Sequence, residues 1–143
     1  MKRAFRFLSI VMVFALLGAM PVLADDTTSK ASSYFMSYDS YLWKTSGNTF
    51  EVWFDVAACT WMDELGASTI EIQRSSDGSS WSTMRTYHSS TYPQMICENT
   101  TGHAGYVSYT GTQGYYYRAY VTFYAKNSSG SAIRFNYAET IRL

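Results

Sequence analysis

Cys97, Glu98 and His103 form the one loose cluster of residue types that could carry out recognisable chemistry. Such side chains bind zinc when several ligands occur at set spacings, and a thiolate beside a base can act as a nucleophile. The cluster lacks the spacing of a zinc site, and a disulfide between Cys97 and Cys59 would remove the thiolate. We therefore expect no metal, no cofactor and no cysteine-nucleophile catalysis.

Acidic residues offer a second kind of chemistry, because two carboxylates that face a cleft can hydrolyse a glycosidic bond. Asp63 and Glu64 are adjacent in the sequence, whereas Asp55 and Glu71 alternate with apolar residues and should point outward from strands. On a small β-sheet protein, acids in these positions are usually solvated surface residues. We therefore expect the protein not to be an enzyme, and an uncharacterised hydrolase is kept as an alternative.

Aromatic residues are the strongest indication of function, since the chain contains 13 tyrosines and 4 tryptophans. Aromatic side chains provide a large contact area at a low entropic cost, and they could stack on sugar rings or anchor a protein partner. The alternative is that the tyrosines only pack across strands, which stabilises a sheet by about 0.2–1 kcal/mol per pair. The candidate binding residues are Trp53, Trp61, Tyr116, Arg118, Tyr120 and Tyr124.

Alternation of apolar and polar residues predicts the strands that position these side chains. Residues 49–58 place Trp53 opposite an apolar row, and residues 115–126 place the candidate tyrosines and Arg118 on one face. Further strands are expected at 41–45, 105–110 and 132–141, and residues 69–88 read as a hairpin around a turn at 76–78. Residues 60–66 are expected to form a short helical turn that bridges two sheets, and 89–105 to be irregular. About seven strands with frequent turns predict an all-β, antiparallel sandwich.

The N-terminus has the pattern of a cleaved secretory signal peptide. Lys2, Arg3 and Arg6 precede an apolar run, and a cleavage site is expected between Ala24 and Asp25. We expect a signal peptide at 1–24, a disordered leader at 25–33 and one β-sandwich domain at 34–143, secreted and extracellular, with no membrane span after cleavage. Three of the 11 basic residues and none of the 11 acidic residues lie in the signal, which leaves 8 against 11, a net charge of −3. This weakly acidic balance argues against a nucleic-acid partner.

Both cysteines would remain in the exported chain, where a cysteine pair usually forms a disulfide. We expect a bond between Cys59 and Cys97, which would stabilise the fold by about 4 kcal/mol in the chain-entropy model. Two buried thiols are the alternative.

Three segments resemble fibronectin type III or immunoglobulin-like domains. Residues 70–78 with Trp81 are similar to the central hairpin of that fold, residues 117–121 to its tyrosine-bearing late strand, and Ala125-Lys126-Asn127 with Gly130 to the turn that follows. The resemblance implies an immunoglobulin-like β-sandwich. The chain also resembles a group of small, uncharacterised secreted proteins of Gram-positive bacteria, which share its Leu65–Ile72 and Ser75–Trp81 patterns. That group implies no activity.

These observations predict a secreted, non-catalytic binding or surface-interaction module whose partner is a glycan or a protein at the cell surface. A small secreted toxin or antimicrobial effector is the alternative. The oligomeric state is left open.

Overall fold

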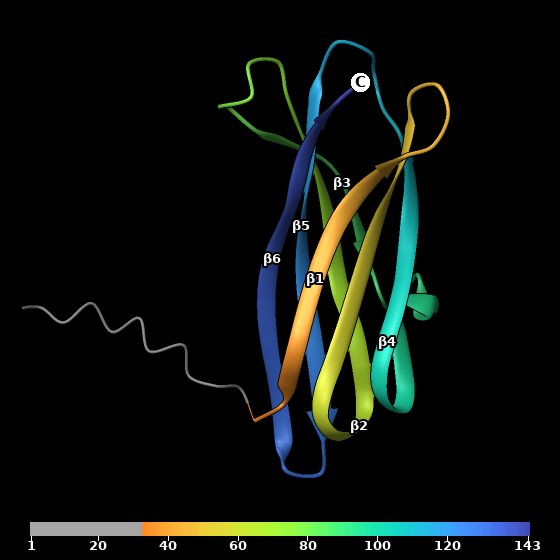
Figure 1. Cartoon of the computed structure of the whole chain (residues 1–143), viewed down its shortest axis with the longest axis vertical. Coiled ribbons are helices and arrows are strands. Elements are labelled where there is room, and N and C mark those ends of the chain that lie inside the picture. Colours follow the sequence, from red (N-terminus) through yellow and green to blue (C-terminus); the bar gives the residue numbers. More distant parts are fainter. Residues whose placement is uncertain (1–32) are drawn as a thin grey trace, which may run out of the picture. The chain divides into compact units, whose positions relative to one another are not determined.

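The computed structural model describes residues 33–143; the expected signal peptide and the leader up to residue 32 lie outside the described residues. Within residues 33–143 the secondary structure is β-strand, apart from one short 3-10 helix, η1 (Pro93–Met95). The strands are β1 (Phe35–Lys44), β2 (Thr49–Ser75), β3 (Ser82–His88), β4 (Ile96–Thr110), β5 (Tyr116–Asn127) and β6 (Gly130–Arg142) (Figure 1). The expected all-β class is confirmed.

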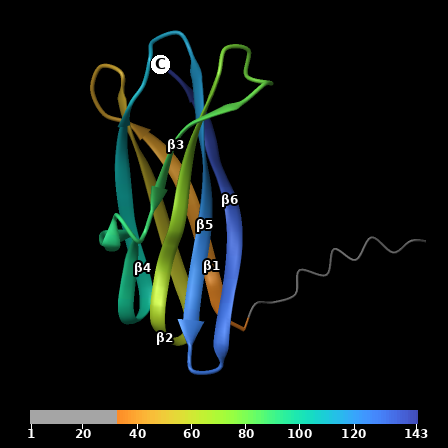
Figure 2. The same ribbon diagram turned by 180° about the vertical axis from the view of Figure 1, so that it is seen from behind.

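The long strand β2 organises the fold, because it takes part in every strand pairing except that of β5 with β6. Residues 50–57 of β2 pair with β1 on one side and with β4 on the other. Residues 69–74 pair with β3 on one side and with β5 on the other, and β5 pairs in turn with β6. All pairings are antiparallel. The strands therefore form two groups that share β2. The first group consists of β1, β2 and β4 (Figure 1), and the second consists of β3, β2, β5 and β6 (Figure 2).

The expected helical turn at residues 60–66 is wrong, since β2 continues through this segment as a strand. The backbone here pairs with β4 from Met62 to Gly66, and from Glu64 onward it also pairs with β5. Neighbouring strands therefore supply the hydrogen bonds that a helical turn would have made internally. Figure 1 shows that β2 still reverses direction in this region, so a bent strand joins the two groups.

The segment 89–105 is also more regular than expected. Only residues 89–92 lie outside regular secondary structure; η1 follows, and β4 begins at Ile96 rather than at Gly105. Because β2 is one strand and not two, residues 33–143 contain six strands rather than about seven.

The hairpin at 69–88 forms as predicted, from the end of β2 and from β3. The carboxylate of Asp77 closes its turn by accepting the backbone N–H groups of Ser79 and Ser80, each at 2.8 Å. These hydrogen bonds favour the charged carboxylate and hold the pKa of Asp77 at about 2, and the bond from Ser80 has the largest effect.

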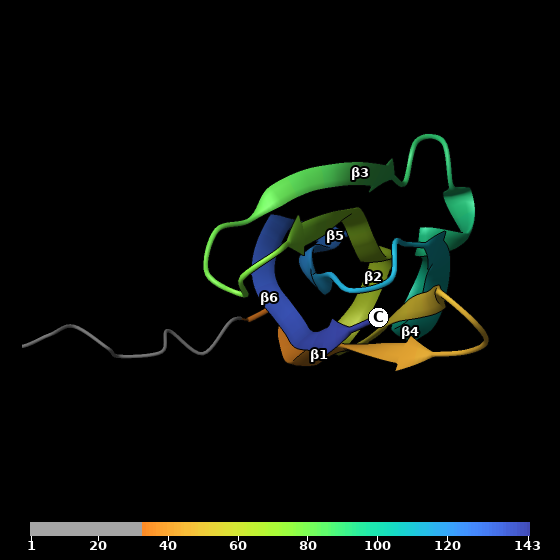
Figure 3. The same ribbon diagram turned by 90° about the horizontal axis from the view of Figure 1, so that it is seen from above.

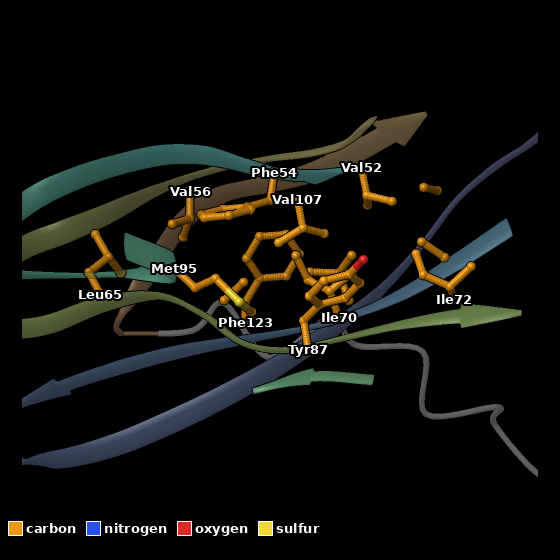
Figure 4. Packing of buried hydrophobic residues seen from close by; sticks show 14 of the residues in the cluster. Val52, Phe54, Val56, Leu65, Ile70, Ile72, Tyr87, Met95, Val107 and Phe123 are labelled. Carbon is orange, nitrogen blue, oxygen red and sulfur yellow. The ribbon is translucent and has the colours of Figure 1, made fainter. Parts of the chain in front are cut away.

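The core lies between the two groups of strands (Figure 4). The inward row of β2 that starts at Phe50 and the alternate residues of β5 that start at Tyr117 are almost fully buried, as their alternation predicted. Met95 of η1 and Tyr87 of β3 close one side of the core. On the opposite side β6 lies beside β1 (Figure 3), and the Asn136 side-chain amide donates a hydrogen bond to Asp39 Oδ1 at 3.0 Å.

Candidate functional site

Trp53 is the centre of a row of three aromatic rings on the outer face of β1, β2 and β4. Alternation along β2 points Trp53 away from the core, and the strand register places Tyr41 of β1 and Tyr106 of β4 directly beside it. The rings of Tyr41 and Trp53 are nearly parallel, at 4° with centroids 6.4 Å apart, and those of Trp53 and Tyr106 are 4.6 Å apart at 29°. We call Tyr41, Trp53 and Tyr106 the outer aromatic row.

The ends of the outer aromatic row face solvent. Tyr41 and Tyr106 are each 46% exposed, whereas Trp53 is half-buried between them. Trp43 lies two residues further along β1, on the same face, opposite Glu51. It is 60% exposed, and its indole has no aromatic partner within residues 33–143. The face therefore presents a highly exposed indole next to a preformed ring stack.

Carboxylates border the row on both sides. Glu51 accepts a hydrogen bond from Trp53 Nε1 at 2.8 Å, which fixes the orientation of the indole. Asp39 and Asp55 lie opposite each other in the next outward register row, and Asp39 is held by Asn136. The face thus combines flat apolar rings with fixed acceptors for hydroxyl or amide donors.

The candidate residues of β5 lie on a different face, and their contacts are largely intramolecular. The Arg118 guanidinium lies between the rings of Trp81 and Tyr137, at 4.3 and 4.5 Å, and its Nε donates to Gln73 Oε1 at 2.7 Å. Tyr120 packs against Tyr137 of β6, with centroids 4.6 Å apart. These side chains form a cross-strand ladder in which each member is partly covered by its neighbours.

Tyr116 and Tyr124 lie on the same outward face of β5 and are also half-buried. The Tyr116 ring is covered by Arg142 at 5.2 Å. Trp61 lies in the segment where β2 bends, outside the part of β2 that pairs with β1, and is 61% exposed. The structure therefore divides the six candidate binding residues among three places.

Sequence reasoning missed Tyr41, Trp43 and Tyr106. The alternation of residues 41–44 carried a signal, because Leu42 turns inward and its two neighbours must then turn outward. No local pattern indicates that Tyr106 stacks on Trp53, since that contact depends on the register between β2 and β4.

The expected disulfide is not present: Cys59 and Cys97 are not bonded to each other. The register of β4 places Cys97 beside Leu65, whereas Cys59 lies where β2 leaves its pairing with β1. A disulfide requires Cα atoms within about 7 Å and converging Cβ atoms, which this register does not provide.

The remaining chemically distinctive residues lie apart. His103 pairs with Val56, and its Nε2 is 2.9 Å from the carbonyl oxygen of Gln94. Glu64 forms an exposed ion pair with Lys126 at 2.8 Å, and this hydrogen bond raises the pKa of Lys126. Within residues 33–143, no three His, Cys, Asp or Glu side chains converge on a point where a metal ion could bind.

No known protein family matches this chain, and no curated protein or solved structure shows significant similarity to it. Among residues 33–143 there is no helix with the length and apolar character needed to cross a membrane.

Proposed function

We propose that this protein is a secreted, non-catalytic binding module with an immunoglobulin-like β-sandwich fold, and that its outer aromatic row with Trp43 binds carbohydrate chains at the cell surface. The observation that carries the proposal is the row itself. Three rings from three strands share one register position, and an exposed indole without an aromatic partner in the described chain lies next to them.

Two features support the sandwich. The strands form a group of three and a group of four that share β2, with the core between them, as two packed antiparallel sheets would. In addition, the buried Tyr117, near the start of β5, accepts a hydrogen bond from the backbone N–H of Thr112 at 2.7 Å. A tyrosine whose hydroxyl bonds to the backbone a few residues upstream, at the corner before a late strand, is typical of immunoglobulin-like folds. The resemblance of residues 117–121 to that late strand agrees with this contact.

The chemistry of the outer face supports a carbohydrate ligand. Sugar rings have apolar faces of C–H groups, which pack on aromatic rings, and a rim of hydroxyls, which need hydrogen-bond partners. Tyr41, Trp43 and Tyr106 supply exposed rings, and Asp55 and Glu51 supply acceptors. Glu51 and Asp39 are already engaged by Trp53 and Asn136, which suits a role in orienting groups rather than in proton transfer.

The proposal is tested by replacing, one at a time, two tryptophans that are almost equally exposed. The exported protein is cosedimented with cell walls and insoluble polysaccharides, as wild type and as the Trp43→Ala and Trp61→Ala variants. We expect saturable binding that weakens about tenfold for Trp43→Ala, because an exposed aromatic anchor is removed. Trp61→Ala should bind like the wild type, since Trp61 lies eight residues along β2 from Trp53, beyond the part that pairs with β1.

Both variants should keep the wild-type melting temperature within about 2 °C, because surface substitutions change stability little. An equal loss of binding in the two variants, or the absence of saturable binding by the wild type, would overturn the carbohydrate proposal.

A further inference from the structure

The edges of β3 and β4 lie next to each other in the view from above (Figure 3), and a groove lies between them. Both strands pair with β2, and within residues 33–143 neither pairs with the other. The groove has a volume of about 640 Å³. Its principal lining residues are Arg85 and Tyr87 of β3, Tyr92 and Gln94 around η1, and His103 and Tyr106 of β4.

Backbone hydrogen bonds show which groups of β4 face this groove. Gly111 N–H, just beyond the end of β4, donates to Asn48 O, so the odd-numbered residues point their backbone groups toward β2. The Tyr87 hydroxyl donates to Ser108 O at 2.7 Å from the opposite side. Because the direction alternates along an antiparallel strand, the N–H and C=O groups of Ala104 and Tyr106 also point away from β2.

The edge of β4 therefore offers a short template for another strand. Its outward backbone groups repeat every two residues, about 6.8 Å, which is the spacing of an extended peptide. The hydrogen bond from the Tyr87 hydroxyl to Ser108 O fixes one end of this template. Burial raises the pKa of Tyr87, so its hydroxyl stays protonated and remains a donor to Ser108 at neutral pH. The other end is bounded by Gln94, whose carbonyl oxygen contacts His103.

The charge of the groove indicates the kind of peptide. Arg85 lies over the Tyr87 ring at 4.7 Å, and its Nη2 donates to the Tyr92 hydroxyl at 2.8 Å. A guanidinium has five N–H donors, so others remain for a ligand. Among residues 33–143, no carboxylate lines the groove. An acidic side chain is the complementary group for this site.

We propose that the groove binds an extended, acidic peptide segment of a partner protein, which adds to the edge of β4 as an antiparallel or parallel strand and places a carboxylate on Arg85. Main-chain hydrogen bonds to the edge groups of Ala104 and Tyr106 provide the recognition of a strand, and Arg85 provides the selectivity for acid. This site is separate from the proposed carbohydrate face except for Tyr106, which borders both.

The test uses synthetic decapeptides of alternating threonine and valine in which one glutamate occupies each central position in turn. Binding to the full exported chain is followed by amide chemical shifts and hydrogen exchange. We expect the amides of Ala104 and Tyr106 to shift and to exchange more slowly when the peptide is bound. A peptide that is N-methylated on the alternate amides facing β4 should bind at least about tenfold more weakly, because it lacks the donors for the edge.

Two variants separate the backbone and charge contributions. Ala104→Pro removes an N–H that points away from β2, a position where an edge strand tolerates proline, and it should abolish the binding; Ala104→Val keeps the N–H and should bind. The Arg85→Glu variant should no longer bind the glutamate peptides, and it should bind peptides in which lysine replaces the glutamate. Arg142→Glu is the control, since Arg142 is also exposed and also lies over a tyrosine, away from the groove.

Several outcomes would overturn the proposal. They are an absence of amide shifts at millimolar peptide in every register, undiminished binding by a folded Ala104→Pro variant, and a lack of charge preference. Concentration-dependent shifts of these amides without peptide would show that a second copy of the chain occupies the edge instead. Shifts induced by oligosaccharide but not by peptide would assign the groove to the carbohydrate ligand. Since the tests do not alter Trp43, the failure of one proposal leaves the other intact.

Discussion

The tryptophans show how far identical side chains differ in their capacity to bind a ligand. Trp53 is enclosed by two tyrosines and held by Glu51, and Trp81 is covered by Arg118. Trp43 and Trp61 retain exposed rings. On the outer face Trp43 is therefore the more exposed indole, while Trp53 is fixed beside it in the ring stack.

Glycine is required at residue 66 by a close backbone approach. Gly66 has a φ of 156°, and a Cβ there would overlap the carbonyl oxygen of Met95. We expect Gly66→Ala to lower the free energy of unfolding by about 3 kcal/mol, because the 3-10 turn that closes the core must move. The free energy is measured by urea denaturation.

Gly47 provides the matched control for this prediction. It also has a positive φ, of 56°, but a Cβ there would meet no atom within 4 Å. Gly47→Ala should therefore cost only about 1 kcal/mol, the conformational penalty alone. Equal losses in the two variants would show that steric contact with Met95 is not the cause.

The sequence predicts whether a single residue points inward or outward better than it predicts which residues lie beside it on neighbouring strands. The inward row from Phe50 and the outward position of Trp53 follow from local alternation, as do the two faces of β5. The partners of those residues depend on register, which alternation within one strand does not determine. This is why Trp53 was found, but the stack with Tyr41 and Tyr106 was not.

At the scale of elements, the bend of β2 was the least predictable part. Residues 60–66 combine a capping threonine, early acids and a glycine, a local pattern that favours a helical turn. Pairing with β4 and β5 overrides this preference, because it satisfies the same backbone groups from outside. Similarly, residues 96–105 lack clear alternation and become a strand only because β2 lies beside them.

The corner between β4 and β5 depends on one hydroxyl. Tyr117→Phe removes the acceptor of the Thr112 N–H while keeping the buried ring. We expect the free energy of unfolding to fall by about 1–2 kcal/mol, since a partly buried donor loses its partner. Guanidinium denaturation measures the change.

Tyr109→Phe serves as the control at this corner. Tyr109 packs against the same rings, Phe50 and Tyr117, and its hydroxyl makes no hydrogen bond in the described part of the chain. Its removal should leave stability within about 0.5 kcal/mol. A similar loss in both variants would indicate that the corner bond contributes nothing specific.

For the whole molecule, a single strand that belongs to both groups makes their stabilities inseparable. We expect the amides of Val52 and Phe54, which face β4, and those of Glu71 and Gln73, which face β5, to exchange with solvent only through global unfolding, with one common free energy. Those of the short edge strand β3 should exchange through local opening. Native-state hydrogen exchange at low denaturant measures these values; different free energies for the two halves of β2 would contradict the expectation.

The path of the outer strands has a mechanical consequence. β1 begins and β6 ends at opposite ends of the bundle, so a pull between these two points runs along the strands (Figure 1). Ladder hydrogen bonds lie perpendicular to such a load and must be sheared together rather than unzipped one at a time. β1 is held to β2, and β6 to β5, along nearly their full lengths. A tether that passes through this domain would therefore transmit tension from a bound surface while the fold stays intact.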